Sequence, residues 1–179
     1  LEVEFSEVQD KFLMLVPDGG VILDFGCGSG RDTRYFLDKG YQVEAIDGSE
    51  KLCEIASRNT GIRVKHIMFA EFDETEKYDG IWACASILHL TKYDLKDVFA
   101  RMIRAVKRGR YIYTSFKYGK YEGIRNGRFF TDFTEDTFDR FIYDFADVFI
   151  TDRWVSEDVR PGRSDEKWLN IILQKSDTV

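Results

Sequence analysis

VILDFGCGSGRD, residues 21–32, is the stretch that decides the fold of this chain. Its apolar start predicts a buried strand over 21–25, and a loop with three alternating glycines follows. A helical pattern then runs over about 30–39, and a second apolar strand over 41–46 ends in Asp47. Strand, glycine loop, helix, strand and acid in this order predict the mononucleotide-binding half of an α/β fold.

The glycine loop and the acid together predict a site for an adenosine-type ligand. Glycines let a ligand approach the backbone closely, and the helix that follows points free N–H groups at the loop. A carboxylate at position 47 can accept two hydrogen bonds from ribose hydroxyls. A tight turn without a ligand is the alternative, and the three glycines with a spaced acid disfavour it.

The loop departs from two common nucleotide-binding motifs. In a dinucleotide fingerprint the third small position would fall on Arg31 or Thr33, and neither residue fits. No Gly-Lys-Ser/Thr follows the glycines, which excludes a P-loop. The pattern D-x-G-x-G-x-G at 24–30 instead resembles motif I of the class I S-adenosylmethionine-dependent methyltransferases.

This resemblance implies that S-adenosyl-L-methionine is the cofactor, with its methionine end wrapped by the glycine loop and its ribose held by Asp47. Arg31 would lie near the cofactor carboxylate, although Asp32 is an alternative partner for it. The full set of expected cofactor-binding residues is Asp24, Gly26, Cys27, Gly28, Gly30, Arg31, Asp47, Gly48, Ser49, Met68, Phe69, Ala83 and Cys84.

The end of the third predicted strand departs from the family pattern. Many members place an acid there that accepts from the adenine amino group, and Met68 stands in that position here. We expect the backbone of Phe69 and Ala70 to read the adenine edge and Met68 to pack on the adenine face. Plain core packing is an equal alternative for Met68.

Candidate catalytic residues follow the fourth and fifth predicted strands, at the edge where α/β sheets bind ligands. The segment 79–89 resembles motif IV and ends in His89, for which a general base and a hydrogen-bonded structural residue are equally expected. Lys117 and Tyr118 follow the fifth strand and are expected to orient the substrate.

Two loops are expected to complete the substrate site. The region 117–132 is rich in Gly, Arg and aromatic residues and is predicted to be a loop that acts as a substrate lid, with an ordinary surface loop as the alternative. Asp158, Arg160 and Arg163 lie in the last loop between strands, which favours an anionic or carboxylate-bearing substrate.

The remaining pattern predicts one α/β domain over 1–179, a Rossmann-like three-layer sandwich. Five β–α alternations followed by a terminal pair of strands match a seven-stranded, mostly parallel sheet with an antiparallel last strand, as in the family. Further strands are expected at 62–68, 80–85, 111–116, 148–155 and 167–174, and further helices at 5–16, after Ser49, after a capping box Thr91-x-x-Asp94, and around Phe138 to Phe145.

Composition limits the classes of partner. The net charge is −6, so no global basic field favours RNA as a partner. The basic run over 101–110 leaves RNA open, although the simpler interpretation is the solvated end of a helix. No apolar stretch approaches the roughly 20 residues that span a bilayer, so no membrane partner is expected. No secretory signal is visible, and the three cysteines are expected to be reduced packing residues of a cytoplasmic protein. Two histidines cannot build a histidine-rich metal cluster, and because the chain begins with Leu1, further residues could precede it.

The chain is therefore expected to be an enzyme that transfers a methyl group to an unidentified small-molecule acceptor. It resembles most the small bacterial tellurite-resistance and methyltransferase-domain proteins, through its FGCGSGRD loop and its SFKYG segment. A catalytically silent cofactor-binding module and a nicotinamide-dependent oxidoreductase are the alternatives, the second disfavoured by Arg31 and by the terminal strands. The acceptor atom and the oligomeric state are left open.

Overall fold

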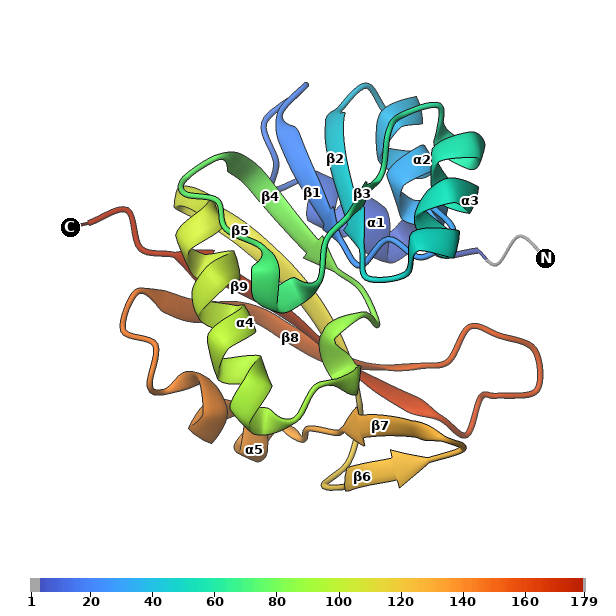
Figure 1. Ribbon diagram of the computed structural model, residues 1–179. Helices are drawn as coiled ribbons and strands as arrows, with labels where there is room; N and C mark the ends of the chain where they lie inside the picture. Colours follow the sequence, from blue (N-terminus) through green and yellow to red (C-terminus); the bar gives the residue numbers. More distant parts are fainter. Residues whose placement is uncertain (1–3, 179) are drawn as a thin grey trace.

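A seven-stranded sheet between two layers of helices forms the body of the computed structural model, which describes residues 4–178 (Figure 1). Leu1, on which the expectation of preceding residues rests, lies outside the described residues. The strands of this sheet are β1 Val21–Phe25, β2 Gln42–Asp47, β3 Lys65–His66, β4 Tyr78–Ala83, β5 Val106–Lys117, β8 Val148–Glu157 and β9 Lys167–Lys175. The helices are α1 Ser6–Leu13, α2 Arg31–Asp38, α3 Glu50–Thr60, α4 Lys92–Ala105 and α5 Glu135–Ile142, with 3₁₀ turns η1 Phe69–Glu71 and η2 Ile87–His89.

The strand order is β3-β2-β1-β4-β5-β9-β8. The first five of these strands are parallel, whereas β9, the last in the chain, runs antiparallel to both β5 and β8. The predicted architecture is confirmed. Because β8 then runs in the same direction as β5, the loop between β8 and β9 returns to the edge where the parallel strands end.

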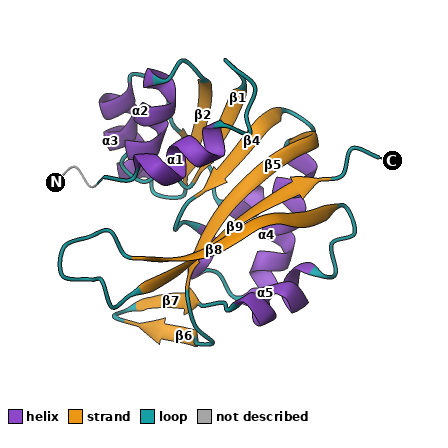
Figure 2. Ribbon diagram, turned by 180° about the vertical axis from the view of Figure 1, so that it is seen from behind, coloured by secondary structure: helices purple, strands orange, loops and turns teal. Residues whose placement is uncertain are grey.

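Alternation along the strands divides the core between the two faces of the sheet. Ile22, Trp82 and Tyr113 pack under α1 and α2, and the Trp82 and Tyr113 rings stack with their centroids 4.2 Å apart. Leu23, which follows Ile22, and Ile81, which precedes Trp82, face the opposite side of the sheet, where α4 and α5 lie. Figure 2 shows α1, α2 and α3 together on the first of these faces.

The predicted helix starts are confirmed at two positions. The Ser49 side chain accepts a hydrogen bond from the Leu52 amide, and that of Thr91 accepts one from the Asp94 amide. Each cap satisfies a backbone donor that the helix itself leaves unpaired.

Two sequence predictions were wrong in part. The third strand is only Lys65–His66, because the chain reaches the sheet at its exposed edge and then turns into η1. The predicted loop 117–132 contains a two-stranded hairpin, β6 Glu122–Arg125 and β7 Arg128–Thr131, which we call the lid hairpin. Its turn is Asn126-Gly127, with φ of 51° and 76°. Asn-Gly is the commonest signal for such a two-residue turn, so the sequence carried this information.

The lid hairpin and the β8–β9 loop lie at the same end of the sheet as the tips of β4 and β5 (Figure 1). In the part of the chain that is described, no helix has both the length and the apolar character needed to cross a membrane.

Candidate active site

The glycine loop between β1 and α2 is held tightly on two sides. A Cβ at Gly26 would lie 2.5 Å from the Ser86 Cβ, and one at Gly30 would lie 2.7 Å from the Thr60 Cγ2. Both glycines also have positive φ, 82° and 92°. A Cβ at Gly28, in contrast, would meet nothing within 4 Å. The loop therefore packs closely against the neighbouring elements and leaves its Gly28 side free for a ligand.

Asp47 joins this loop to the next one. Its carboxylate accepts from the Gly28 amide through Oδ2 and from the Ser49 amide through Oδ1, each at 2.9 Å. Asp47 is half-buried, and each of its carboxylate oxygens can accept a further hydrogen bond. The sequence-predicted residues Gly28, Asp47, Gly48 and Ser49 are thus brought together at the end of β2.

Met68 and Phe69 lie beside the end of β2 and the glycine loop. A Cβ on Gly48 would lie 3.2 Å from the Met68 sulfur, and Met68 is 49% exposed, so it is not a core residue. The Phe69 ring stacks on Phe25 with centroids 4.5 Å apart. An exposed thioether next to a fixed ring is suited to pack on the face of a purine.

Asp24 is buried behind the glycine loop. Its carboxyl accepts a hydrogen bond of 2.6 Å from the Thr33 hydroxyl and is 2% exposed. Burial, with the negative charge of Asp32 nearby, raises the pKa of Asp24 to about 8. The raised pKa favours the protonated form of Asp24, and its side chain joins the end of β1 to the first turn of α2.

Asp32 anchors three elements at once. Its carboxylate accepts from Gln9 Nε2 of α1 at 2.7 Å and from Trp82 Nε1 of β4 at 2.9 Å. It also pairs with Arg31 on α2, with Nε and Oδ1 3.0 Å apart. The alternative partner expected for Arg31 is thus present, and the Arg31 guanidinium also lies 4.9 Å from the Phe5 ring centre at the cavity wall.

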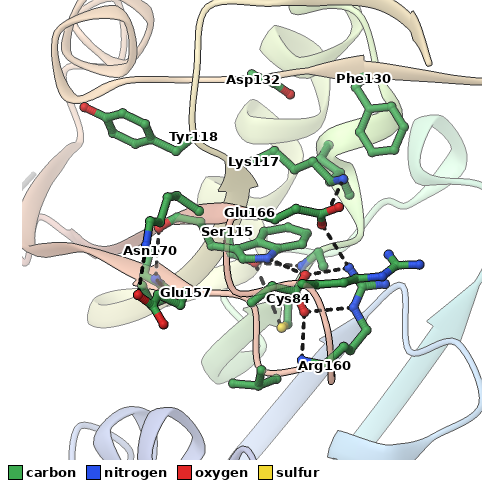
Figure 3. Close-up of a pocket in the computed structure, with 18 of the residues that line it drawn as sticks. Cys84, Ser115, Lys117, Tyr118, Phe130, Asp132, Glu157, Arg160, Glu166 and Asn170 are labelled. Carbon is green, nitrogen blue, oxygen red and sulfur yellow. Dashed lines mark hydrogen bonds and ion pairs between the residues drawn. The ribbon is translucent and has the colours of Figure 1, made fainter. Parts of the chain in front are cut away.

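A cavity of about 930 Å³ lies at the carboxyl edge of the sheet (Figure 3). Its walls come from the start of α2, the ends of β4 and β5, η2, the lid hairpin and the β8–β9 loop. The predicted residues Arg31, Cys84, His89, Lys117 and Tyr118 all line it. The glycine loop and Asp47 are not part of the cavity lining, although Arg31, the residue after Gly30, is.

The cavity floor contains a strained turn after β4. Ala85 has a φ of 48°, unfavourable for a residue with a Cβ, and its amide donates to the Ser115 hydroxyl at 2.8 Å. Beside it, burial raises the pKa of the Cys84 thiol well above its ordinary range, and the same holds for Cys27 in the glycine loop. Both thiols are neutral packing groups, as expected from the sequence.

His89 is fixed by a backbone carbonyl. Its Nδ1 lies 2.8 Å from the Phe129 oxygen, and because a carbonyl only accepts, we assign the ring proton to Nδ1. The Nε2 lone pair is then left to accept a proton. Burial lowers the pKa of His89, and the positive charges of Arg128 and Lys117 lower it further, so the ring is neutral at pH 7.

The side chains of Lys117 and Tyr118 point in different directions. The Lys117 ammonium lies 3.5 Å from Glu166 Oε2 and 5.0 Å from the centre of the Phe130 ring. The Tyr118 hydroxyl donates to Glu135 Oε2 at 2.9 Å and points away from Lys117 (Figure 3). Lys117 is therefore much better placed than Tyr118 to contact an acceptor.

Charged and aromatic residues of the region 117–132, which the sequence predicts to be a lid, divide into two groups. Arg125 and Arg128 line the cavity, with Arg125 held by two hydrogen bonds to Asp132, of 2.9 and 2.6 Å. Tyr121 and Glu122 are engaged elsewhere, by the Ile124 carbonyl and by Lys92.

Sequence reasoning missed the residues that connect the β8–β9 loop to the cavity. Trp168 Nε1 donates to Asp158 at 3.0 Å, and Asp158 is paired with Arg160, which leaves only Arg163 of the three expected residues without an acidic partner among residues 4–178. The Tyr113 hydroxyl donates to Asn170 Oδ1 at 2.6 Å. A polar residue inside the apolar run of β9 was the available signal for Asn170.

Comparison with solved structures gives the class. The 1,6-didemethyltoxoflavin-N1-methyltransferase of Burkholderia thailandensis, solved with bound 1,6-didemethyltoxoflavin and S-adenosylhomocysteine, has a TM-score of 0.78 at 23% identity, covering 96% of this chain and 76% of that one. A TehB-like SAM-dependent methyltransferase from Corynebacterium glutamicum has a TM-score of 0.72 at 18% identity, covering 94% and 87%. The fold is that of the class I methyltransferases.

Sequence comparisons point to the same class of protein. Residues 22–109 match the family described as methyltransferase domain. YqeM of Bacillus subtilis (strain 168), which carries the name of a methyltransferase, is 29% identical over 100 residues, or 51% of this chain and 40% of YqeM. The family match covers just under half of the chain, and YqeM supports the same similarity to methyltransferases. The matched stretch spans less than half the length of each of four curated relatives.

The tight packing of Gly30 leads to a prediction with a matched control. Gly30→Ala and Gly40→Ala both place a Cβ at a φ near 90°, which costs about 1–2 kcal/mol. Only Gly30→Ala also meets Thr60, whereas Gly40 has nothing within 4 Å. We expect Gly30→Ala to lose about 1–3 kcal/mol more free energy of unfolding in urea. Equal losses would show that Thr60 moves aside freely.

The buried carboxyl of Asp24 leads to a prediction on pH dependence. Because its pKa is raised in the fold, the unfolded chain releases this proton first, and stability falls as the pH rises from about 4 toward about 8. Asp24→Asn removes that proton release. We expect the variant to gain stability relative to the parent between pH 5 and pH 8 in urea titrations, while Asp38→Asn on the exposed side of α2 shows no such trend. A difference independent of pH would mean that Asp24 is ionised in the fold.

Proposed function

We propose that this chain is an S-adenosyl-L-methionine-dependent methyltransferase that acts on a small-molecule acceptor. The observation that carries the proposal is the bridge from Asp47 to the Gly28 and Ser49 amides, on the free side of the glycine loop. This proposed cofactor groove lies next to a cavity of about 930 Å³, within the usual range of small-molecule sites.

The residues fit a bound sulfonium nucleoside. Gly28 has no neighbour where a Cβ would stand, Asp47 has acceptor capacity for sugar hydroxyls, and Met68 offers an exposed face for the base. Toward the cavity, Arg31, Ala83 and Cys84 would surround the methionine end. Asp24, Gly26, Cys27 and Gly30 shape the loop, while Gly48, Ser49 and Phe69 support the ribose and the base.

The bound cofactor supplies an electrophilic methyl group, so the protein mainly has to align the acceptor with it. The cavity walls hold the acceptor and exclude water. His89 takes the acceptor proton at Nε2 if the nucleophile is protonated at neutral pH. Lys117 orients the acceptor through its ammonium group, and Tyr118 has only a supporting part, since Glu135 holds its hydroxyl.

Other assignments remain predictions. That residues 1–179 form one domain is supported by a single sheet that contains strands from Val21 to Lys175. Tellurite as acceptor is suggested by the sequence resemblance and by the TehB-like fold neighbour, and RNA by the basic end of α4. Four of the five cations of the basic run over 101–110 are paired with acids, which favours a small molecule over RNA. They are Arg101, Arg104, Lys107 and Arg108.

The direct test is transfer of label. The purified protein is incubated with methyl-labelled cofactor and with cell extract separated into small molecules, RNA and protein. We expect label in the small-molecule fraction, and tellurite is added separately as its own arm. Cofactor binding without turnover in any fraction would support the catalytically silent module, and binding of NAD in its place would support the oxidoreductase.

The ribose assignment predicts the effect of Asp47→Ala. The variant loses the carboxylate that would accept two sugar hydroxyls, and hydrogen bonds to a charged group contribute about 1.5–3 kcal/mol each. We expect the affinity for S-adenosylhomocysteine to fall at least tenfold in calorimetry, with Asp38→Ala as a control outside the groove. Unchanged affinity would remove the assignment.

The assignment of His89 predicts the effect of His89→Gln on the pH profile. With the acceptor found by labelling, the parent kcat should fall as the pH drops through the lowered pKa of His89, below about 6.5. The variant should lose about 10²- to 10⁴-fold in kcat and lack this limb, with the KM for the cofactor retained. A variant that keeps kcat and loses only stability would make His89 a structural anchor for Phe129.

A further inference from the structure

The charge balance of the cavity is opposite to that of the chain. The whole sequence has 26 basic and 32 acidic residues. The cavity lining has seven basic residues, Arg31, Lys117, Arg125, Arg128, Arg160, Arg163 and Lys167, against five acidic ones, Asp132, Glu157, Asp158, Asp165 and Glu166. A cleft lined by an excess of one sign attracts ligands of the other sign.

Most of these charges are already neutralised by one another. Arg125 pairs with Asp132, Arg160 with Asp158, and Lys167 with Glu157. Within residues 4–178, Arg128 and Arg163 have no carboxylate within 4 Å. Among the acids of the lining, only Asp165 has no cation within 4 Å, and it is exposed on the β8–β9 loop, two residues after Arg163. Arg163 therefore shares its loop with an acid that has no cation partner, whereas Arg128, on the lid hairpin, does not.

Arg128 and Lys117 lie on the same side of the cavity. The centre of the Phe130 ring lies 4.7 Å from that of His89 and 5.0 Å from the Lys117 Nζ. Arg128 lines the same cavity and precedes Phe129, whose carbonyl is hydrogen-bonded to His89. The Lys117 ammonium has three donors and a single, long contact of 3.5 Å to Glu166. Two cations with spare donors therefore flank the residue that would accept the proton.

Aromatic rings stand beside these cations. The Lys117 Nζ lies 5.0 Å from the centre of Phe130 and 5.9 Å from that of Trp168. Figure 3 shows Phe130 and Lys117 side by side at the cavity. The volume of about 930 Å³ is far larger than a small inorganic oxyanion needs and suits an organic molecule.

We propose that the acceptor is an organic anion, whose carboxylate or phosphate is bound by Arg128 and Lys117 while its apolar body packs against Phe130 and Trp168. This inference rests on the proposed methyl transfer for its biological meaning, but anion recognition can be measured without turnover. Arg163 at the rim would attract the anion without contacting it in the bound position.

The test compares matched ligands on the intact chain saturated with S-adenosylhomocysteine. Ligand-observed NMR and calorimetry are run with pairs such as 4-hydroxybenzoate and 4-hydroxybenzamide across a panel of aromatic scaffolds, with aryl phosphates as a second arm. Inorganic phosphate and tellurite, each alone, form a third arm. We expect one class of organic anion to bind at least tenfold tighter than its neutral matches, and the first two arms identify which class.

The variant Arg128→Gln should lose about tenfold or more in affinity for the anions and little for the amides. Arg140→Gln, exposed on α5 and outside the cavity lining, is the matched control and should change neither. Equal binding of acids and amides across the panel, or anion affinity unaffected by Arg128→Gln, would overturn the inference, as would inorganic anions that bind as tightly as organic ones. Failure of the chain to bind S-adenosylhomocysteine would instead overturn the proposed function, because that binding is measured first and separately.

Discussion

The absence of a side chain at Gly26 and Gly30 is the constraint on which the rest of the structure depends. At these positions the loop after β1 packs against Ser86 on one side and against Thr60 of α3 on the other. The close approach brings Gly28 within hydrogen-bond distance of Asp47 at the end of the next strand. A larger residue at either glycine would move the loop away and break this bond, so packing in the core sets the geometry of the groove.

The buried ionisable groups around the glycine loop and the cavity are either neutral or hydrogen-bonded. Behind the loop, Asp24 is neutral and Asp32 is satisfied by three donors from α1, α2 and β4. In the cavity the Cys84 thiol and the His89 ring are both neutral at pH 7. Removing these charges from buried positions avoids the desolvation penalty of unpaired ions and leaves a base at His89. The buried carboxylates of the cavity wall, Asp132 and Asp158, are paired with Arg125 and Arg160.

Sequence predicted the first half of the molecule well because its signals are local. An apolar run, alternating glycines and an acid one strand later leave few conformations for β1, the loop and Asp47. Ser49 and Thr91 fixed two helix starts in the same way. The exposed edge strand β3 was overestimated, because its pattern of apolar residues extends beyond the short stretch that pairs with β2.

The second half was harder to predict because its contacts join distant segments. Asn126-Gly127 was a local signal for the lid hairpin and should have been recognised. No local pattern could place Trp168 and Asp158 together with Lys117 and Glu166, since those contacts exist only after β9 has inserted between β5 and β8. The hydrogen bond from the Tyr118 hydroxyl to Glu135 was likewise out of reach of a local pattern, because Glu135 belongs to the later helix α5.

This division between the halves matches the proposed division of the site. The family match ends at residue 109, and the residues proposed to bind the cofactor all lie before that point. Most of the cavity wall comes after it, from Tyr113 through the lid hairpin to Asn170, with Arg31, Cys84 and His89 as the links. Relatives that share the matched segment can therefore differ in most of the residues that line the cavity. Similarity in the shared segment argues for the methyl donor, and only the later segment of this chain, with Lys117, Arg128 and Phe130, can argue for what receives the methyl group.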